Sequence, residues 1–327
     1  MPGHAIIRPT EGCEAMKFLV MGAGALGSAF GGMLADAGHE VILIGRERYM
    51  RPINERGLKI TGIWGTHFIK DITAQTEPPA DCVPDVVLLA TKSFDTEAAI
   101  SAIEPFINED TVVISLQNGI GNEEIIAEHI GSERTMGGMV ITGFETVRPG
   151  EVKVTVAADT TKIGELNNTD SERLKAIVSA FNEAGIPSEA VDNIKMYIWA
   201  KALYNAALNP LSAIFRVNYG KLLDPNAFSI IEDLITEAFS VAAAAKVELF
   251  WEEPEDYLEY LRSAQIPPTE KHRSSMLNDI EQGKKTEIDF LNGVFVRLGK
   301  EHGIPTPVNE TITRSIKFLE NLSHIIT

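Results

Sequence analysis

Cysteine and long apolar runs are scarce in this sequence. Its 327 residues include only two cysteines, Cys13 and Cys82, which are too few for a disulfide framework. The sequence contains no Cys-x-x-Cys and no His-Glu-x-x-His motif, and its seven histidines lack ligand spacing, so we expect no structural or catalytic metal. No apolar run approaches the ~18–20 residues that a membrane-spanning helix needs, so we expect no membrane segment.

Positively charged residues are also few. Lysine and arginine number 29 against 46 aspartates and glutamates, which gives a formal net charge of −17. This balance argues against nucleic acid as a general partner, because phosphate backbones bind basic surfaces. An anionic small molecule would need a locally basic pocket. The 44% of apolar residues and the length are typical of a soluble globular protein with one large or two ordinary domains.

The first fifteen residues lack the apolar core of a signal peptide. They contain only the short apolar patch Ala5–Ile7, and Met16 stands directly before the first strong strand pattern. We therefore expect residues 1–15 to be a peripheral extension and the protein to be cytoplasmic.

A glycine-rich turn follows this first strand pattern, residues 17–21, and precedes a helix pattern that extends to Ala37 and a second apolar run at residues 40–44. In this position a G-x-G-x-x-G motif indicates a dinucleotide-binding unit, with a pyrophosphate at the helix N-terminus, where unpaired amides and the helix dipole favour an anion. A glycine-rich turn without a ligand is the alternative. The expected cofactor-binding residues of the motif are Gly22, Ala23, Gly24, Ala25, Leu26 and Gly27.

The residue that follows the second strand selects the nicotinamide cofactor. NAD enzymes usually carry Asp or Glu there, which accepts hydrogen bonds from the ribose hydroxyls. This sequence has Gly45, Arg46 and Glu47 instead. The guanidinium fork of Arg46 suits a 2′-phosphate and favours NADP, but Glu47 leaves NAD open, and an ordinary surface role for Arg46 is the alternative.

Polar residues follow two further apolar runs, at residues 85–90 and 111–116. In open α/β sheets, ligands bind outside the carboxyl ends of the strands. Lys92 and Asn118 are therefore both expected at the ligand-binding edge of the sheet, beside the cofactor, as cofactor-binding residues. A solvated loop lysine and ordinary Asn-Gly turn chemistry are the alternatives for these two residues.

The pattern changes near residue 190, because nearly everything from Asn193 onward reads as helix. We therefore expect a Rossmann-type dinucleotide-binding domain at residues 16–190 and an all-α domain at residues 191–327. The apolar character of this second half is compatible with a homodimer.

One helix of the second half carries a polar face. The segment Tyr197–Pro210 is rich in helix formers, and we expect it to stop at Pro210. Lys201, Asn205 and Asn209 fall at i, i+4 and i+8, so they project from one side of this otherwise apolar helix. The polar groups of a buried face must be hydrogen-bonded or must line a cavity. Two interpretations follow: a structural hydrogen-bond network, or the wall of an active site in which Lys201 transfers a proton.

A glutamate in a later segment is a second candidate. Ser274 and Thr286 are predicted N-caps, and Glu287 would then lie in the first turn of a helix. Compensation of the helix dipole is the alternative explanation for this glutamate.

With these motifs in place, the sequence resembles the ketopantoate reductases (2-dehydropantoate 2-reductases), from Lys17 to near the C-terminus. The resemblance is carried by the glycine motif and by segments 91–92, 118–119, 199–210, 274–276 and 286–289. It implies NADPH-dependent reduction of ketopantoate, a 2-keto acid, to pantoate, with Lys201 as general acid and Glu287 as its carboxylate companion. It further implies that Asn118, Asn205, Asn209 and Ser275 orient the substrate, and that Arg46 and Lys92 serve NADP.

Two other functions stay open. The same residues would serve a reductase of another branched 2-keto acid. The shape of the pocket decides between such substrates, and one methylene changes the discrimination by only ~1–3 kcal/mol. A non-catalytic NADP-binding sensor would have no use for a lysine and two asparagines on one helix face.

Overall fold

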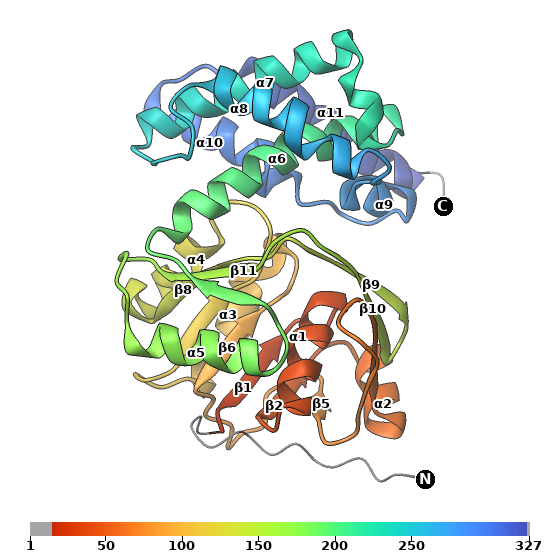
Figure 1. Ribbon diagram of the computed structural model, residues 1–327, viewed down its shortest axis with the longest axis vertical. Coiled ribbons are helices and arrows are strands. Elements are labelled where there is room, and N and C mark those ends of the chain that lie inside the picture. Colours follow the sequence, from red (N-terminus) through yellow and green to blue (C-terminus); the bar gives the residue numbers. More distant parts are fainter. Residues whose placement is uncertain (1–14, 326–327) are drawn as a thin grey trace. The chain divides into compact units, whose positions relative to one another are not determined.

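The computed structural model describes residues 15–325 and divides into two compact units (Figure 1). Residues 15–117 and 122–194 form the sheet unit, and residues 118–121 and 195–325 form the helical unit. The predicted fold class, a Rossmann-type α/β domain followed by an all-α domain, is confirmed. Cys13 and nearly all of the expected extension at residues 1–15 lie outside the described residues.

The sheet unit is built on an eight-stranded sheet in which all neighbouring strands are parallel except β8 and β11. Its strands, in spatial order, are β12 (Ser188–Ala190), β11 (Thr161–Glu165), β8 (Thr135–Met139), β7 (Val112–Ser115), β6 (Val86–Leu89), β1 (Lys17–Met21), β2 (Glu40–Ile44) and β5 (Thr73–Gln75).

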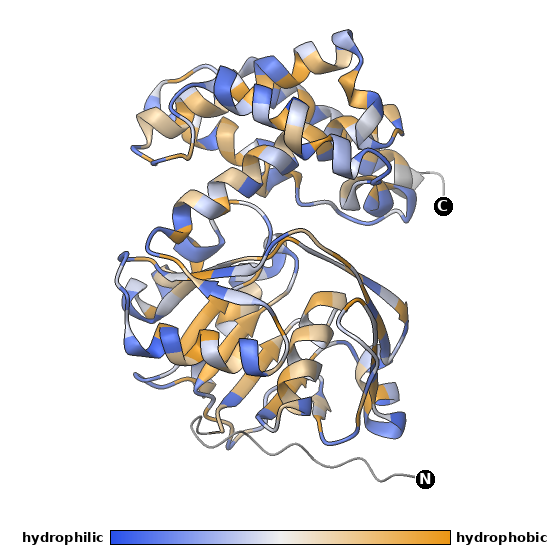
Figure 2. Cartoon of the chain, viewed as in Figure 1, coloured by the Kyte–Doolittle hydropathy of each residue, from blue (hydrophilic) through white to orange (hydrophobic). Residues whose placement is uncertain are grey.

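The central strands are buried on both faces, which explains their continuous apolar runs. Phe18 and Val20 of β1 belong to the core that also holds α1 (Ala25–Asp36) and α5 (Glu172–Glu183). The intervening Leu19 belongs to the core beneath the helices on the other face, α3 (Thr96–Ile103) and α4 (Asn122–Ile130). Figure 2 shows these central strands in the orange of apolar residues. The remaining helical segments of this unit are α2 (Glu47–Arg56), η1 (Ser93–Asp95), η2 (Glu104–Phe106) and η3 (Ser132–Arg134).

A second, four-stranded sheet covers α1 on the side away from the first sheet. Its order is β4 (His67–Ile69), β3 (Leu58–Gly62), β10 (Glu151–Ala157) and β9 (Thr142–Arg148). Two adjacent glycines let α1 pack tightly between the sheets. A Cβ on Gly31 would lie 2.5 Å from Leu43 Cδ2 of the first sheet, and one on Gly32 would lie 2.7 Å from Ile60 Cδ1 of the second.

The helical unit contains six α-helices within the described residues, with an apolar core contributed mainly by α6 and α7. No helix of residues 15–325 combines the length and apolarity needed to cross a bilayer. The α-helices are α6 (Ile194–Phe215), α7 (Pro225–Ala244), α8 (Pro254–Tyr260), α9 (Ser275–Glu281), α10 (Asn292–His302) and α11 (Pro307–Ile325). The shorter helical segments are η4 (Tyr219–Leu223), η5 (Leu261–Gln265), η6 (Pro267–Thr269) and η7 (Ile288–Phe290).

The expected end of α6 at Pro210 is wrong, because the helix continues to Phe215. A proline inside a helix leaves the carbonyl four residues earlier without its usual amide donor. Here that carbonyl belongs to Ala206, and Asn292 of α10 donates its Nδ2 to it at 3.1 Å. A tertiary hydrogen bond thus replaces the missing helical one, and proline is accommodated inside a buried helix.

The short loop 118–121 also differs from expectation. This loop falls within residues 16–190, the predicted first domain, but the structure groups it with the helical unit. The amide of Ile120 donates to the carbonyl of Phe290 at 2.9 Å, and the Ile120 side chain is buried in the helical core. The structure places the unit boundary between Ile194 and Lys195.

Candidate active site

The glycine turn after β1 needs glycine at its first and last positions. Gly22 has φ +106°, and a Cβ there would lie 2.6 Å from the backbone nitrogen of Thr91. A Cβ on Gly27 would lie 2.3 Å from the carbonyl oxygen of Gly22. Amides of Gly22 and Ala23 both donate to the carbonyl of Ile44, at 3.0 and 2.9 Å. The turn is therefore pinned between β1, β2 and β6.

The middle glycine borders open space at the start of α1. A Cβ on Gly24 would meet nothing within 4 Å. Gly24 is the N-cap of α1, no side chain caps the helix there, and the first turn holds no acidic residue. The amides of the first turn, at Ala25, Leu26 and Gly27, are thus available to an anion, and the helix dipole favours one. This arrangement fits the pyrophosphate of a dinucleotide.

Two predicted cations lie at the carboxyl ends of strands in the sheet unit. Arg46 follows β2 after one glycine, is exposed, and is the N-cap residue of α2. Lys92 follows β6, is partly buried, and is the N-cap residue of η1. Sequence reasoning missed Arg48, a second exposed arginine two residues after Arg46. The Cζ atom of Arg48 lies 4.7 Å from the ring centre of Tyr49.

A hydrogen-bonded network stiffens the same edge of the first sheet. The side-chain amide of Gln117 donates to Thr91 Oγ1 at 3.1 Å and to Thr96 Oγ1 at 2.8 Å. The hydroxyl of Thr96 donates to the carboxamide oxygen of Asn122 at 2.9 Å. These bonds tie the ends of β6 and β7 to the starts of α3 and α4, so the loop that holds Lys92 has a fixed geometry.

In the helical unit, α6 carries the predicted polar face. Lys201 and Asn205 are partly buried and Asn209 is buried, while neighbours such as Trp199 and Leu203 pack into the core. Burial lowers the pKa of Lys201 to about 8, and the negative charge of Glu287 acts against this by raising it. A lysine with such a pKa exchanges its proton near neutral pH, as a general acid must.

A small cavity of the helical unit brings together four of the six residues predicted for substrate binding and catalysis. They are Asn118, Asn209, Ser275 and Glu287. The cavity is completed by Met276, Asp279 and Leu291, which sequence reasoning missed. Asp279 lies one helical turn after Ser275 on α9, so helical periodicity applied to the Ser275 motif was the available signal. Lys201 and Asn205 are not among the lining residues.

Asn118 and Glu287 meet although they are far apart in the chain. Asn118 Nδ2 donates to Glu287 Oε2 at 3.4 Å. The turn that presents Asn118 requires glycine next to it: Gly119 has φ +88°, and a Cβ there would lie 2.4 Å from the carbonyl oxygen of Phe290.

The expected position of Glu287 in the first turn of a helix is wrong. Glu287 is the N-cap residue of the short η7, and α10 begins only at Asn292. Thr286 caps only the short η7: its Oγ1 accepts from the Ile288 amide at 3.3 Å, while its hydroxyl donates to Glu320 Oε1 on α11 at 2.7 Å. Dipole compensation of a long helix therefore does not explain this buried carboxylate.

The backbone and side chain of Asn209 are both anchored. Tyr219 donates its hydroxyl to Asn209 Oδ1. Ser274 donates its hydroxyl to the Asn209 carbonyl at 3.2 Å and accepts from the Leu277 amide at 3.0 Å, which confirms the predicted N-cap of α9.

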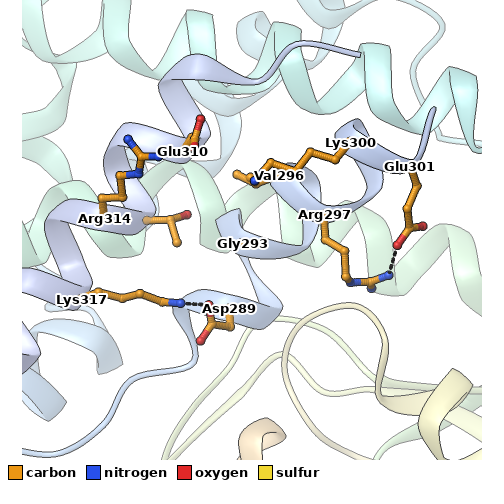
Figure 3. Close-up of a pocket in the computed structure, with 10 residues that line it drawn as sticks. Asp289, Gly293, Val296, Arg297, Lys300, Glu301, Glu310, Arg314 and Lys317 are labelled. Carbon is orange, nitrogen blue, oxygen red and sulfur yellow. Dashed lines mark hydrogen bonds and ion pairs between the residues drawn. The ribbon is translucent and has the colours of Figure 1, made fainter. Parts of the chain in front are cut away.

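A second hollow of the helical unit, of ≈ 470 Å³ between α10 and α11, holds none of the predicted residues (Figure 3). Its charged side chains pair with one another. Lys317 Nζ lies 2.5 Å from Asp289 Oδ1, and Arg297 Nη1 lies 3.1 Å from Glu301 Oε1. Because its cations are largely neutralised by neighbouring carboxylates, we assign the candidate site to the cavity beside Glu287.

Within the described residues, no three His, Cys, Asp or Glu side chains are grouped as a metal site requires.

Comparison with known proteins covers nearly the whole chain. The family model described as "Ketopantoate reductase PanE/ApbA" matches residues 18–168, and the model described as "Ketopantoate reductase PanE/ApbA C terminal" matches residues 193–320. A 2-dehydropantoate 2-reductase of Aquifex aeolicus (strain VF5) is 40% identical over 309 residues, which cover 93% of this chain and 97% of that protein.

Two solved structures show the same fold. The crystal structure of a PanE/ApbA family ketopantoate reductase from Ralstonia eutropha JMP134 has a TM-score of 0.84 at 32% identity, covering 94% of this chain and 100% of the other. The ternary structure of a D-mandelate dehydrogenase with NADH and anilino(oxo)acetate has a TM-score of 0.86 at 30% identity, also covering 94% and 100%. The chain is therefore similar, over 93–94% of its length, to proteins named 2-dehydropantoate 2-reductase, ketopantoate reductase and D-mandelate dehydrogenase.

Proposed function

The chain belongs to the ketopantoate reductase family of oxidoreductases, and we propose that it catalyses the NADPH-dependent reduction of 2-dehydropantoate (ketopantoate) to pantoate. The single observation that carries the proposal is a lysine of lowered pKa, Lys201, in electrostatic contact with Glu287, a carboxylate that lines a polar cavity.

The chemistry of a keto-acid reduction suits this pair. A bound nicotinamide would supply hydride to the ketone carbon, and the ketone oxygen would take up a proton from the protein. Lys201 is the proton donor in this proposal, because burial lowers its pKa. The negative charge of Glu287 opposes this effect, so the Lys201 amine is mostly protonated near pH 7. The carboxamides of Asn118 and Asn209 and the hydroxyl of Ser275 supply hydrogen bonds that orient the substrate's oxygens.

The sheet unit would hold the cofactor. The first-turn amides of α1 would bind the pyrophosphate, and the open space beside Gly24 supports this assignment. Arg46 would bind the 2′-phosphate of NADP, and Lys92 would contribute a second cation. The related D-mandelate dehydrogenase holds NADH, so the choice between the two cofactors needs a direct test.

Replacing Arg46 by alanine provides that test. We expect wild-type protein to bind NADPH more tightly than NADH, and Arg46→Ala to weaken NADPH by ~10- to 100-fold, because a hydrogen bond to a charged group is worth ~1.5–3 kcal/mol. NADH binding should change little. Fluorescence titration of both cofactors measures the effect, and Arg56→Ala, an exposed arginine at the other end of α2, is the matched control. Equal losses for the two cofactors would show that Arg46 does not read the 2′-phosphate.

The substrate is tested by turnover of a small panel of 2-keto acids with NADPH. We expect kcat/KM for ketopantoate to exceed that for 2-ketoisovalerate and pyruvate, which lack its distal hydroxyl, by ~100-fold or more. A site built to bond a hydroxyl rejects analogues without one, since its buried polar groups are then left unpaired. Equal efficiency for 2-ketoisovalerate, or a preference for an aryl keto acid such as phenylglyoxylate, would assign the protein to another 2-keto acid.

A further inference from the structure

The buried Tyr219 controls which end of the Asn209 carboxamide faces the candidate cavity. Tyr219 lies on η4, ten residues after Asn209, and its side chain is 2% exposed. Its hydroxyl contacts Asn209 Oδ1, and Asn209 itself lines the cavity. The pair thus connects a residue outside the cavity to one of its walls.

The direction of this hydrogen bond follows from the buried hydroxyl proton. Burial raises the pKa of Tyr219 well above its ordinary value, so the phenol keeps its proton. Asn209 is the sole hydrogen-bond partner of this hydroxyl among residues 15–325. If Asn209 turned its NH₂ group toward Tyr219, the phenol would accept and its own proton would stay buried without an acceptor, which is costly. Tyr219 therefore donates to Oδ1.

The backbone around Tyr219 fixes the position of its ring. The Tyr219 amide donates to the carbonyl of His272 at 3.2 Å, and the next amide, of Gly220, donates to the carbonyl of Glu270 at 2.9 Å. The ring packs edge-to-face on Tyr204, with centroids 5.8 Å apart, and Tyr204 is itself bonded to Thr269 Oγ1 at 3.0 Å. A rigid donor at this position leaves the carboxamide one favourable orientation.

We propose that Tyr219 is a positioning residue for substrate specificity: it locks Asn209 with its NH₂ group toward the cavity, so that Asn209 donates to an oxygen of the substrate. This inference rests on the proposed function and specifies one of its contacts. The favoured substrates are 2-keto acids with a hydroxyl oxygen at that position, as in ketopantoate. An analogue with a methyl group there would leave the NH₂ group unpaired.

The test compares ketopantoate with trimethylpyruvate, which differs from it only by the missing distal hydroxyl. The measured quantity is the ratio of the two kcat/KM values. Tyr219→Phe keeps the ring and removes the hydroxyl, and we expect it to lower the ratio about tenfold, mainly through KM for ketopantoate, as expected for one hydrogen bond. Tyr260→Phe, which removes the hydroxyl of an exposed tyrosine on α8, is the matched control and should keep the wild-type ratio.

A second comparison separates positioning from general damage to the fold. If Tyr219 acts through Asn209, Tyr219→Phe should lower the ratio no further in an Asn209→Ala background. A loss of activity that is equal for both substrates would mean that Tyr219 is merely structural, and a wild-type ratio retained by Tyr219→Phe would also overturn the inference. A wild-type enzyme with a ratio near one would instead refute the proposed substrate, and the positioning inference with it.

Discussion

Lys201→Ala is expected to lower kcat for ketopantoate by about 10²–10⁴-fold. Removal of a positioned general acid typically costs this much, because the developing negative charge on the ketone oxygen is then neutralised only by water. Binding of NADPH should stay near the wild-type level, since the residues proposed to hold the cofactor belong to the sheet unit. Steady-state kinetics and a cofactor titration on the same preparation measure both effects.

Lys221→Ala is the matched control for this substitution, because Lys221 is an exposed lysine of the helical unit. It should leave kcat unchanged.

Lys201→Met adds a measurement of stability to that of activity. A buried base with a lowered pKa destabilises the fold while it is protonated, so an apolar replacement should raise the melting temperature at pH 7 while abolishing turnover. If Lys201 were part of a purely structural network, Lys201→Met would lower the melting temperature together with activity.

Glu287→Gln is expected to lower kcat/KM ~5- to 50-fold at pH 8. The negative charge of Glu287 raises the pKa of Lys201, so its removal lowers that pKa below about 8. A drop of ~1–2 units, as is usual when a nearby opposite charge is removed, leaves only a small fraction of Lys201 protonated at pH 8. The activity loss should therefore shrink as the pH is lowered toward 6, which a kcat/KM profile records.

Asp289→Asn is the matched control, since this nearby carboxylate pairs with Lys317 in the other hollow. It should leave the profile unchanged. Glu287 and Lys201 are proposed to act as a unit, so Glu287→Gln should add little to the loss in a Lys201→Ala background. Fully multiplicative effects of the two substitutions would show that they act separately.

The central strands and the glycine turn were predictable because local sequence determines them. The strands β1, β6 and β7 are buried on both faces, which demands short continuous apolar runs, and Gly22 requires a positive φ. By contrast, β9 is an edge strand with mixed polar and apolar residues, and it pairs with β10 without an apolar pattern that would reveal it.

Residues of the candidate site could be proposed from local sequence where one helix carries them, and less readily where distant segments meet. Helical periodicity alone places Lys201 and Asn209 on one face of α6. The continuation of α6 through Pro210 depends on Asn292, which lies far along the chain, and no local pattern reports that hydrogen bond. Likewise, the selection of the Asn209 orientation by Tyr219 follows from burial and tertiary contacts.

The most direct measurement of the proposed proton donation is the pH dependence of kcat for ketopantoate reduction, from pH 6 to 10, in wild type and Lys201→Ala. Only the protonated amine donates, so wild-type kcat should be constant at low pH and fall tenfold per pH unit above a midpoint of about 8. The residual activity of Lys201→Ala should lack this alkaline fall. An alkaline fall with the same midpoint in Lys201→Ala would contradict the assignment of Lys201 as the general acid.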